Sequence, residues 1–194
     1  MESLQKGGSV YLLPDFYDKA DLIRSQFQGK FSVPSMDHDG MTQLVYAYSE
    51  SKYQFLTASA DHFFTPDVIE DLMTRIRDWG KDELGTQNIS TPQTRVYITG
   101  CYRGFLVDGV RAQWHYTLSI SGERGRRSVG VFKVLANGSR HEGTPQFGIG
   151  LVTSAHMSFN QLLVHPAKAA YSVELGKKSM NPSEADIYLD GYLW

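Results

Sequence analysis

The segment Gly109–Gly122, GVRAQWHYTLSISG, gathers side chains that could carry out chemistry. Its β-branched and aromatic residues favour a β-strand, and residues two apart along a strand point to the same side. That side carries four polar residues: Arg111, Gln113, His115 and Thr117. A histidine there can transfer protons or bind a metal ion. Two interpretations remain open, a polar face exposed to water or the polar interior of a small barrel that holds one ligand.

The other residues capable of chemistry form weaker patterns. His38 and His62 lie beside aspartates in MDHDG and ADHFF, but neither segment has the spacing by which a helix or strand presents two metal ligands. Cys101 lies in no activating motif and is expected to be a small buried residue. No G-x-S-x-G nucleophile motif occurs. If the chain binds a metal ion, His115 and His165 form the best pair of nitrogen ligands.

The composition of the chain indicates an ordinary globular protein. Its 194 residues carry a formal net charge of −2, with 41% hydrophobic and 21% charged residues, so neither disorder nor a nucleic-acid partner is indicated. One cysteine excludes an internal disulfide and fits the cytoplasm, where we expect the protein. Neither a signal peptide nor an apolar run of roughly 18 residues occurs, so we expect no membrane partner. We expect one domain over residues 1–194.

Helical patterns occur in the first part of the chain. DKADLIRSQFQGK is expected to form a helix between a cap at Asp18 and a stop at Gly29, after a short strand in SVYLLPDF that Pro14 ends. The clearest helix is TPDVIEDLMTRIRDWGKDEL, with Thr65 as its cap and Pro66 in its first turn. Its apolar residues recur at helical spacing and predict a helix that packs on a flat surface.

Strand patterns dominate the second part. Seven runs rich in β-branched and aromatic residues are separated by turn segments such as GERGRR and NGSRHEGTP. The runs are TRVYITGCY, VRAQWHYTLSISG, SVGVFKVLAN, FGIGLVT, NQLLVHP, AAYSVEL and ADIYLDGYLW. TQLVYAYS, ahead of the long helix, also fits a strand. Helices followed by strands predict an α+β fold, with a helical and strand part over about residues 1–90 and barrel strands over about 93–194.

Four motifs follow one another in this second part: W-H-x-x-L, a hairpin into VFKVLAN, N-x-L-L-V with a later x-S-V-E, and a C-terminal DGYLW. With helices ahead of them, they resemble the prolyl-hydroxylase-like branch of the 2-oxoglutarate and iron(II) dependent oxygenases. The resemblance covers about the last 100 residues and, more loosely, the whole chain. It implies a double-stranded β-helix, which is a jelly roll, with helices packed on one sheet. Two histidines and one carboxylate bind iron in that family and leave positions open for co-substrate and oxygen.

The resemblance also implies a degenerate iron site. His115 matches the first histidine of the family, but the carboxylate position two residues later is Thr117. The second histidine falls on Tyr171. The arginine that grips 2-oxoglutarate falls on Asp186, whose charge would repel that co-substrate. Three departures from the family's residues, at three functional positions, indicate that the binding sites for both iron and 2-oxoglutarate are lost.

Three functions remain open on this basis. We favour a metal-independent enzyme of small-molecule biosynthesis, such as a cyclase, lyase or isomerase, in which polar groups of the pocket transfer protons without a cofactor. The catalytic candidates are His115, Thr117 and Tyr171, and the candidate substrate-binding residues are Arg111, Gln113, Lys133 and Asp186. The basic and amide side chains would hold an anionic group of the substrate. The alternatives are a working iron(II) and 2-oxoglutarate hydroxylase with misaligned ligands, and a non-catalytic protein that binds a ligand or serves as a partner subunit.

Overall fold

The computed structural model describes residues 10–30, 45–49, 53–97, 102–106, 111–121, 131–135, 151–169, 171–174 and 186–194. The helices in these ranges are α1 (Ala20–Lys30), the short 3-10 helix η1 (Ala60–His62) and α2 (Pro66–Leu84). The strands are β1 (Tyr11–Leu13), β2 (Val45–Ser49), β3 (Tyr53–Ser59), β4 (Gln93–Tyr97), β5 (Tyr102–Leu106), β6 (Trp114–Ser119), β7 (Val131–Leu135), β8 (Leu151–Ala155), β9 (Gln161–Pro166), β10 (Tyr171–Glu174) and β11 (Asp186–Leu193).

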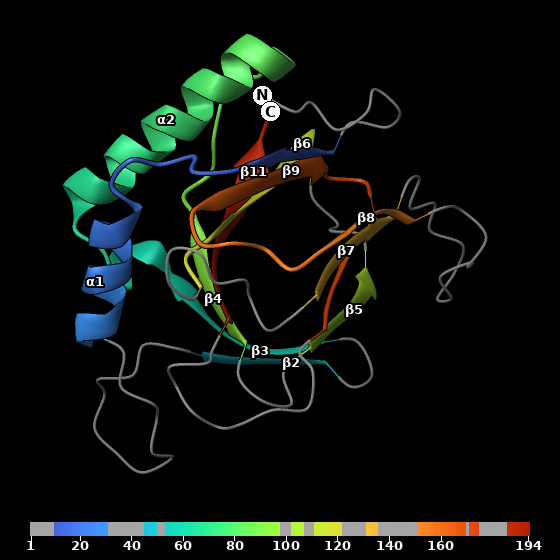
Figure 1. Cartoon of the computed structure of the whole chain (residues 1–194), viewed down its shortest axis with the longest axis horizontal. Helices are drawn as coiled ribbons and strands as arrows, with labels where there is room; N and C mark the ends of the chain where they lie inside the picture. Colours follow the sequence, from blue (N-terminus) through green and yellow to red (C-terminus); the bar gives the residue numbers. More distant parts are fainter. Residues whose placement is uncertain are drawn as a thin grey trace.

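The strands form one antiparallel sheet that curves into an open barrel (Figure 1). Their order is β1-β9-β6-β11-β4-β3-β5-β10-β7-β8, with β2 paired to β3. Most neighbours in this order are distant in the sequence, as in a jelly roll. The curvature brings β5, β7 and β10 opposite β6, β9 and β11 (Figure 1). The prediction of an α+β protein with a double-stranded β-helix core is therefore confirmed.

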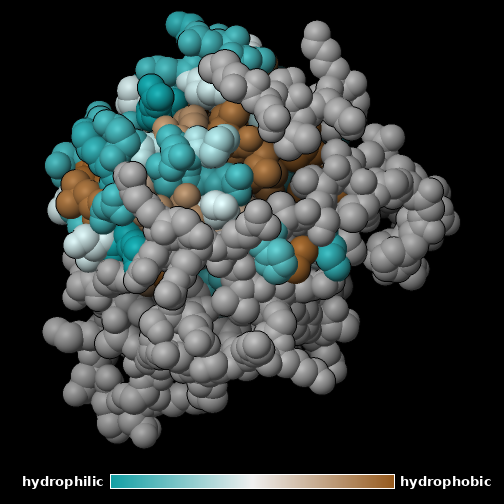
Figure 2. All heavy atoms as spheres, viewed as in Figure 1, coloured by the Kyte–Doolittle hydropathy of each residue, from teal (hydrophilic) through white to brown (hydrophobic). Residues whose placement is uncertain are grey.

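Helices α1 and α2 cover the outer face of the sheet (Figure 1). The apolar stripe of α2 is buried there: Leu72 and Ile76 belong to one cluster with Leu118 of β6 and Leu189 of β11. Each such side chain contributes about 1.5–3 kcal/mol when it leaves water. Hydrophilic side chains lie on the outer surface of both helices (Figure 2). No helix in the described ranges is long and apolar enough to cross a membrane.

The ends of α2 agree with the sequence prediction in position but differ in detail. Thr65 is the residue before the first turn, yet its side chain makes no capping hydrogen bond. Its hydroxyl instead accepts a hydrogen bond from Gln26 Nε2 of α1 at 3.2 Å. The helix ends at Leu84, where Gly85 adopts φ 71°, a left-handed conformation that glycine takes without strain. The hydrogen bond between Gln26 and Thr65 fixes the first turn of α2 to α1.

The strands differ from the sequence prediction at their bounds. β6 begins at Trp114, because the chain bends at Arg111–Gln113 and does not yet pair as a strand. The run TRVYITGCY contains the end of β4, at Tyr97, and the first residue of β5, Tyr102, and residues 98–101 between them lie outside the described residues. β3 was not predicted, since it runs directly into η1 without a glycine or proline turn. Strands therefore also occur among the first helices.

The start of β9 is held by an asparagine in an uncommon conformation. Asn160 has φ 59°, and its buried side chain bonds to the backbone of Tyr17 in both directions. Its Oδ1 accepts from Tyr17 N at 2.9 Å, and its Nδ2 donates to Tyr17 O at 2.7 Å. The corner between β1 and α1 is thereby attached to the strand that carries His165.

Candidate functional site

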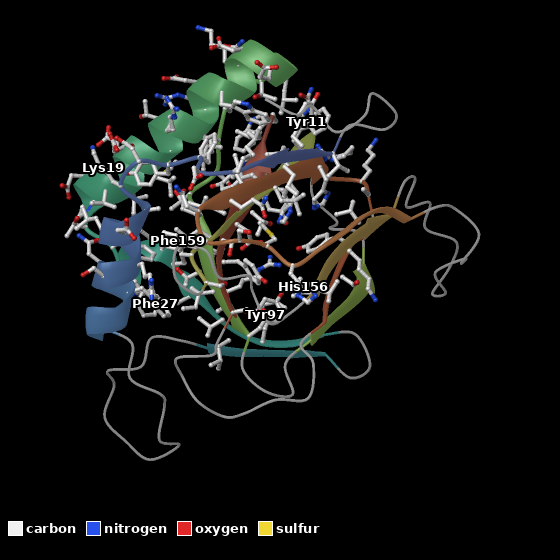
Figure 3. The ribbon with its side chains drawn as sticks, in the orientation of Figure 1. Tyr11, Lys19, Phe27, Tyr97, His156 and Phe159 are labelled. Atoms are coloured by element: carbon white, nitrogen blue, oxygen red, sulfur yellow. The ribbon has the colours of Figure 1, made fainter. Side chains whose placement is uncertain are left out.

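The residues of β6 alternate between two environments. Tyr116 and Leu118 pack against the helices in the outer apolar cluster. His115 and Thr117 point to the opposite side, the interior of the barrel, and each is 1% exposed. Tyr97 of β4 also lies within the ring of strands (Figure 3). The inner face of this layer therefore holds two of the four polar residues that the sequence pattern had placed on one side, His115 and Thr117.

A chain of polar side chains crosses this inner face from β4 to β9. Arg95 Nη2 lies 2.9 Å from Asp190 Oδ2, and the same oxygen lies 3.0 Å from His115 Nε2. His115 Nδ1 lies 3.0 Å from His165 Nε2, and His165 Nδ1 lies 2.9 Å from the carbonyl oxygen of Pro166. We call Arg95, Asp190, His115 and His165 the inner polar chain. Its members are buried, except that the Arg95 side chain is 15% exposed.

Hydrogen-bond geometry determines how many protons the inner polar chain holds. A carbonyl oxygen only accepts, so His165 Nδ1 must carry a proton for Pro166. The contacts from Asp190 to His115 and from His115 to His165 need one proton each. A carboxylate and two neutral imidazoles hold two protons, whereas these three bonds require three.

Tyr171 reaches the same site from β10, on the opposite part of the sheet. Its ring stacks on that of His115, with 4.8 Å between centroids and an interplanar angle of 23°. Its hydroxyl accepts a hydrogen bond from Arg95 Nη1 at 2.8 Å. The guanidinium of Arg95 therefore bridges Tyr171 and Asp190. The structure thus brings the three predicted catalytic residues, His115, Thr117 and Tyr171, onto the inner face, while their catalytic roles stay predictions.

The four residues predicted to bind substrate lie in different places. The prediction that Arg111 and Gln113 share the inner face with His115 is wrong, because both precede β6 and are exposed. Lys133 lies on β7 opposite Ser172. Its neighbour Val134 packs in one cluster with Tyr171, so alternation along β7 turns Lys133 to the other face of the sheet. Asp186 is buried on the inner side of β11.

The inner polar chain does not fit an iron ion. Thr117 and Tyr171 stand at two of the three ligand positions that the resemblance implies. Asp190 and His165 bring a carboxylate and a second imidazole, but they contact opposite nitrogens of the His115 ring, so the three groups cannot converge on one metal. The Arg95 guanidinium also repels a divalent cation. Among residues whose placement is described, no group of three His, Cys, Asp or Glu could hold a metal ion.

The sequence reasoning missed two members of the inner polar chain, Asp190 and Arg95. Asp190 shares its side of β11 with Asp186, and the alternation of DIYLD was the available signal. Arg95 is the one charged residue of β4, whose sequence is QTRVY, and gave no pattern that points to the site. His165 was weighed as a second nitrogen ligand beside His115. The structure does bring these two histidines together, but as hydrogen-bond partners.

Comparisons with known proteins place the architecture. No protein-family model and no curated protein matches this sequence. A Pseudomonas putida prolyl-4-hydroxylase has a TM-score of 0.62 at 13% identity, over 96% of this chain and 92% of that one. The α-ketoglutarate dependent epimerase SnoN of nogalamycin biosynthesis has a TM-score of 0.69 at 9% identity, over 95% and 77%. The carbocyclase SnoK of the same biosynthesis has a TM-score of 0.64 at 8% identity, over 96% and 79%.

These likenesses extend over nearly the whole chain, but the sequence identities are low. Such a match establishes how the strands are arranged and leaves the reaction to the residues of the site. The sheet order and the covering helices lead to the same architecture. This chain has the double-stranded β-helix fold of the 2-oxoglutarate and iron(II) dependent oxygenases.

Proposed function

We propose that this protein is a metal-independent enzyme that uses the oxygenase fold for redox-neutral chemistry on a small molecule, such as cyclisation, elimination or isomerisation. One observation carries this function: protein groups hold both ring nitrogens of His115, at 3.0 Å from Asp190 and at 3.0 Å from His165. A histidine that binds iron needs one nitrogen for the metal.

The inner polar chain is suited to moving a proton within the protein. Asp190, His115 and His165 share protons along two consecutive hydrogen bonds, so a proton that arrives at Asp190 shifts the next one toward His165. Arg95 keeps a fixed positive charge beside the Asp190 carboxylate throughout. The protein would thus accept and return a proton without a net change in the oxidation state of the substrate.

Two structural neighbours are consistent with such products. SnoN is named as an epimerase and SnoK as a carbocyclase, and both are described as α-ketoglutarate dependent. The fold therefore accommodates enzymes that change stereochemistry or close a ring. We propose that this chain reaches products of that kind with its own acid and base groups instead of the co-substrate.

Iron binding gives the first test. Anaerobic calorimetric titration of the purified protein with Fe(II) should show no stoichiometric binding, because two ligand positions carry Thr117 and Tyr171 and both nitrogens of His115 are engaged. The His115→Ala variant is the matched control and should give the same weak, non-stoichiometric heat. A one-to-one site of micromolar affinity or better that disappears in His115→Ala would refute the proposed function and support the hydroxylase.

Product mass gives a second readout of the same question. The protein would be incubated with pools of small hydroxylated metabolites under argon with a chelator, and the products analysed by mass spectrometry. A redox-neutral enzyme yields products of unchanged mass or of the substrate mass less a small neutral molecule, whereas a hydroxylase adds one oxygen atom. His115→Gln should lower saturated turnover by roughly 10²- to 10⁴-fold, since glutamine cannot relay a proton. Oxygen-dependent turnover, or unchanged saturated turnover in the variant, would contradict this role.

A non-catalytic binding protein or partner subunit is the second candidate. One observation favours it: every ring nitrogen of His115 and His165 has a hydrogen-bond partner within the protein. These hydrogen bonds stabilise the barrel whether or not a reaction takes place. In that case His115→Gln would lower thermal stability, and no pool would be converted by the wild-type protein.

A further inference from the structure

Two buried oxygens on the inner face lack a partner within the protein. Thr117 Oγ1 and Asp190 Oδ1 make no hydrogen bond, although their residues are 1% and 3% exposed. A buried polar atom left without a partner loses its hydration and gains nothing in return. Two such atoms beside the inner polar chain indicate a place where a further group binds.

These two oxygens belong to directly opposed residues. Thr117 and Asp190 are paired across β6 and β11, and opposed side chains on one face have Cβ atoms about 4.5–5.5 Å apart. Both face inward, because Asp190 contacts His115, which lies two residues from Thr117 on the same side of β6. One small group between them could therefore reach both oxygens.

The chemistry of the two oxygens defines that group. Asp190 Oδ2 already receives Arg95 and His115, which leaves Oδ1 as an acceptor that requires a donor. A threonine hydroxyl both donates and accepts. An O–H group satisfies the pair, since it donates to the carboxylate and accepts from the threonine. An ionised carboxylate only accepts hydrogen bonds, so it has no proton to donate to Asp190 Oδ1 and does not satisfy the pair.

We propose that Thr117 Oγ1 and Asp190 Oδ1 bind one hydroxyl group of a neutral, hydroxylated substrate, whose place a water molecule takes in the resting protein. This inference rests on the proposed function and deepens it, because it names the substrate class. It also assigns the contact with substrate to Asp190. His115 has no ring nitrogen left for a ligand and becomes a positioning residue behind the carboxylate.

Crystal structures test this site without any turnover. Wild-type crystals should show a water peak within hydrogen-bond distance of both oxygens, and a soak in ethylene glycol should replace it by one hydroxyl of the diol. A soak in acetate, the anionic control, should leave the water in place. An empty site, a bound acetate, or water that the diol never displaces would each overturn the hydroxyl site.

Two variants give an independent readout. Thr117→Val keeps the shape of the side chain but removes the hydroxyl, so the diol should be absent from its crystals and the melting temperature should fall by roughly 2–4 °C. Thr117→Ser retains the hydroxyl and should still bind the diol. A rise in melting temperature in Thr117→Val would show that the oxygen is dry and unpartnered in the native protein, which contradicts the site.

The outcomes separate this inference from the proposed function. Stoichiometric iron binding or oxygen-dependent turnover would remove the metal-independent function, whatever occupies the space between Thr117 and Asp190. An empty or anion-filled site would remove the hydroxyl ligand, while turnover under argon would still support proton transfer.

Discussion

The outer and inner faces of the layer formed by β9, β6 and β11 come from the same strands and meet opposite requirements. On the outer face, Leu118 and Leu189 pack with α2 in a hydrophobic cluster. On the inner face, one residue away in each strand, Thr117 and Asp190 belong to a polar interior. Stability that comes from buried apolar surface tolerates exchange among apolar residues of similar size. A buried polar network is stable only when each group keeps its hydrogen-bond partner.

This difference supports the inner face as the location of the proposed function. The outer face supplies apolar burial that holds the helices on the sheet. The inner face buries a carboxylate, two imidazoles and most of a guanidinium, which is unfavourable unless charges and hydrogen bonds are matched. A barrel that only needed to be stable would gain from apolar residues at these positions. The proposed function therefore explains the inner polar chain better than a contribution to stability does.

Removal of the fixed positive charge should have the largest effect. Arg95→Met removes the ion pair with the buried Asp190 carboxylate and the hydrogen bond to the Tyr171 hydroxyl. Loss of one partner of a buried pair costs about 4 kcal/mol. Urea unfolding followed by circular dichroism would measure the loss in the free energy of unfolding.

Arg77→Met is the matched control for that experiment. Arg77 is exposed, and its nitrogen lies 3.9 Å from Asp78, so this pair contributes about 0–1 kcal/mol. If Arg95→Met cost no more than Arg77→Met, the inner polar chain would not depend on its charge balance, and the contrast between the two faces would fail.

On the outer face, the free energy of unfolding should depend only on the size of the apolar side chains. Leu118→Ala removes a fully buried side chain from the apolar cluster and should cost about 3 kcal/mol. Leu118→Met keeps the volume and should cost under about 1.5 kcal/mol. Leu22→Ala, at a leucine that is 45% exposed, serves as the control for the loss of side-chain atoms. An equally large loss in Leu118→Met would show that this face is as sensitive to chemistry as the inner one.

Local patterns predict the elements of this fold better than its site. The stripe of α2 and the alternation of β6 depend on residues close in the sequence, so both could be predicted. The bend at Arg111–Gln113 could not, because it depends on backbone bonds of Gln113 to Leu193 and Ala167. Distant pairing of this kind leaves no local pattern.

The site shows the same limit. His115 stood out because a histidine within an apolar strand is rare, and the motif around it supported the fold. Its partner Asp190 comes from β11, and Arg95, the partner of Asp190, comes from β4. Only the register of the sheet brings Asp190 within 3.0 Å of both His115 and Arg95. Sequence spacing cannot supply that register, since it depends on how the whole barrel closes.

A carboxylate at the protein surface should show the smallest effect, and its pH dependence gives a contrast with Asp190. Asp71 Oδ2 accepts a hydrogen bond from the Tyr17 hydroxyl at 2.7 Å and another from Lys19 Nζ at 2.9 Å. The bond from Tyr17, followed by that from Lys19, holds the pKa of Asp71 below its ordinary value. A carboxyl group with a lowered pKa in the folded protein stabilises it above its unfolded pKa of about 4, and this stabilisation is lost as the pH falls through the folded pKa.

Asp71→Asn should therefore lower the melting temperature slightly at pH near 7, and the difference from wild type should vanish in acid as the pH falls through the lowered folded pKa of Asp71. Thermal unfolding of both proteins across that range is the measurement. Lys19→Met is the control, because the exposed pair with Lys19 is screened by water and should contribute less than the bond from the buried Tyr17. A difference between Asp71→Asn and wild type that persisted in acid would mean that the amide disturbs packing, and that the charge of Asp71 is not what stabilises the junction between α1 and α2.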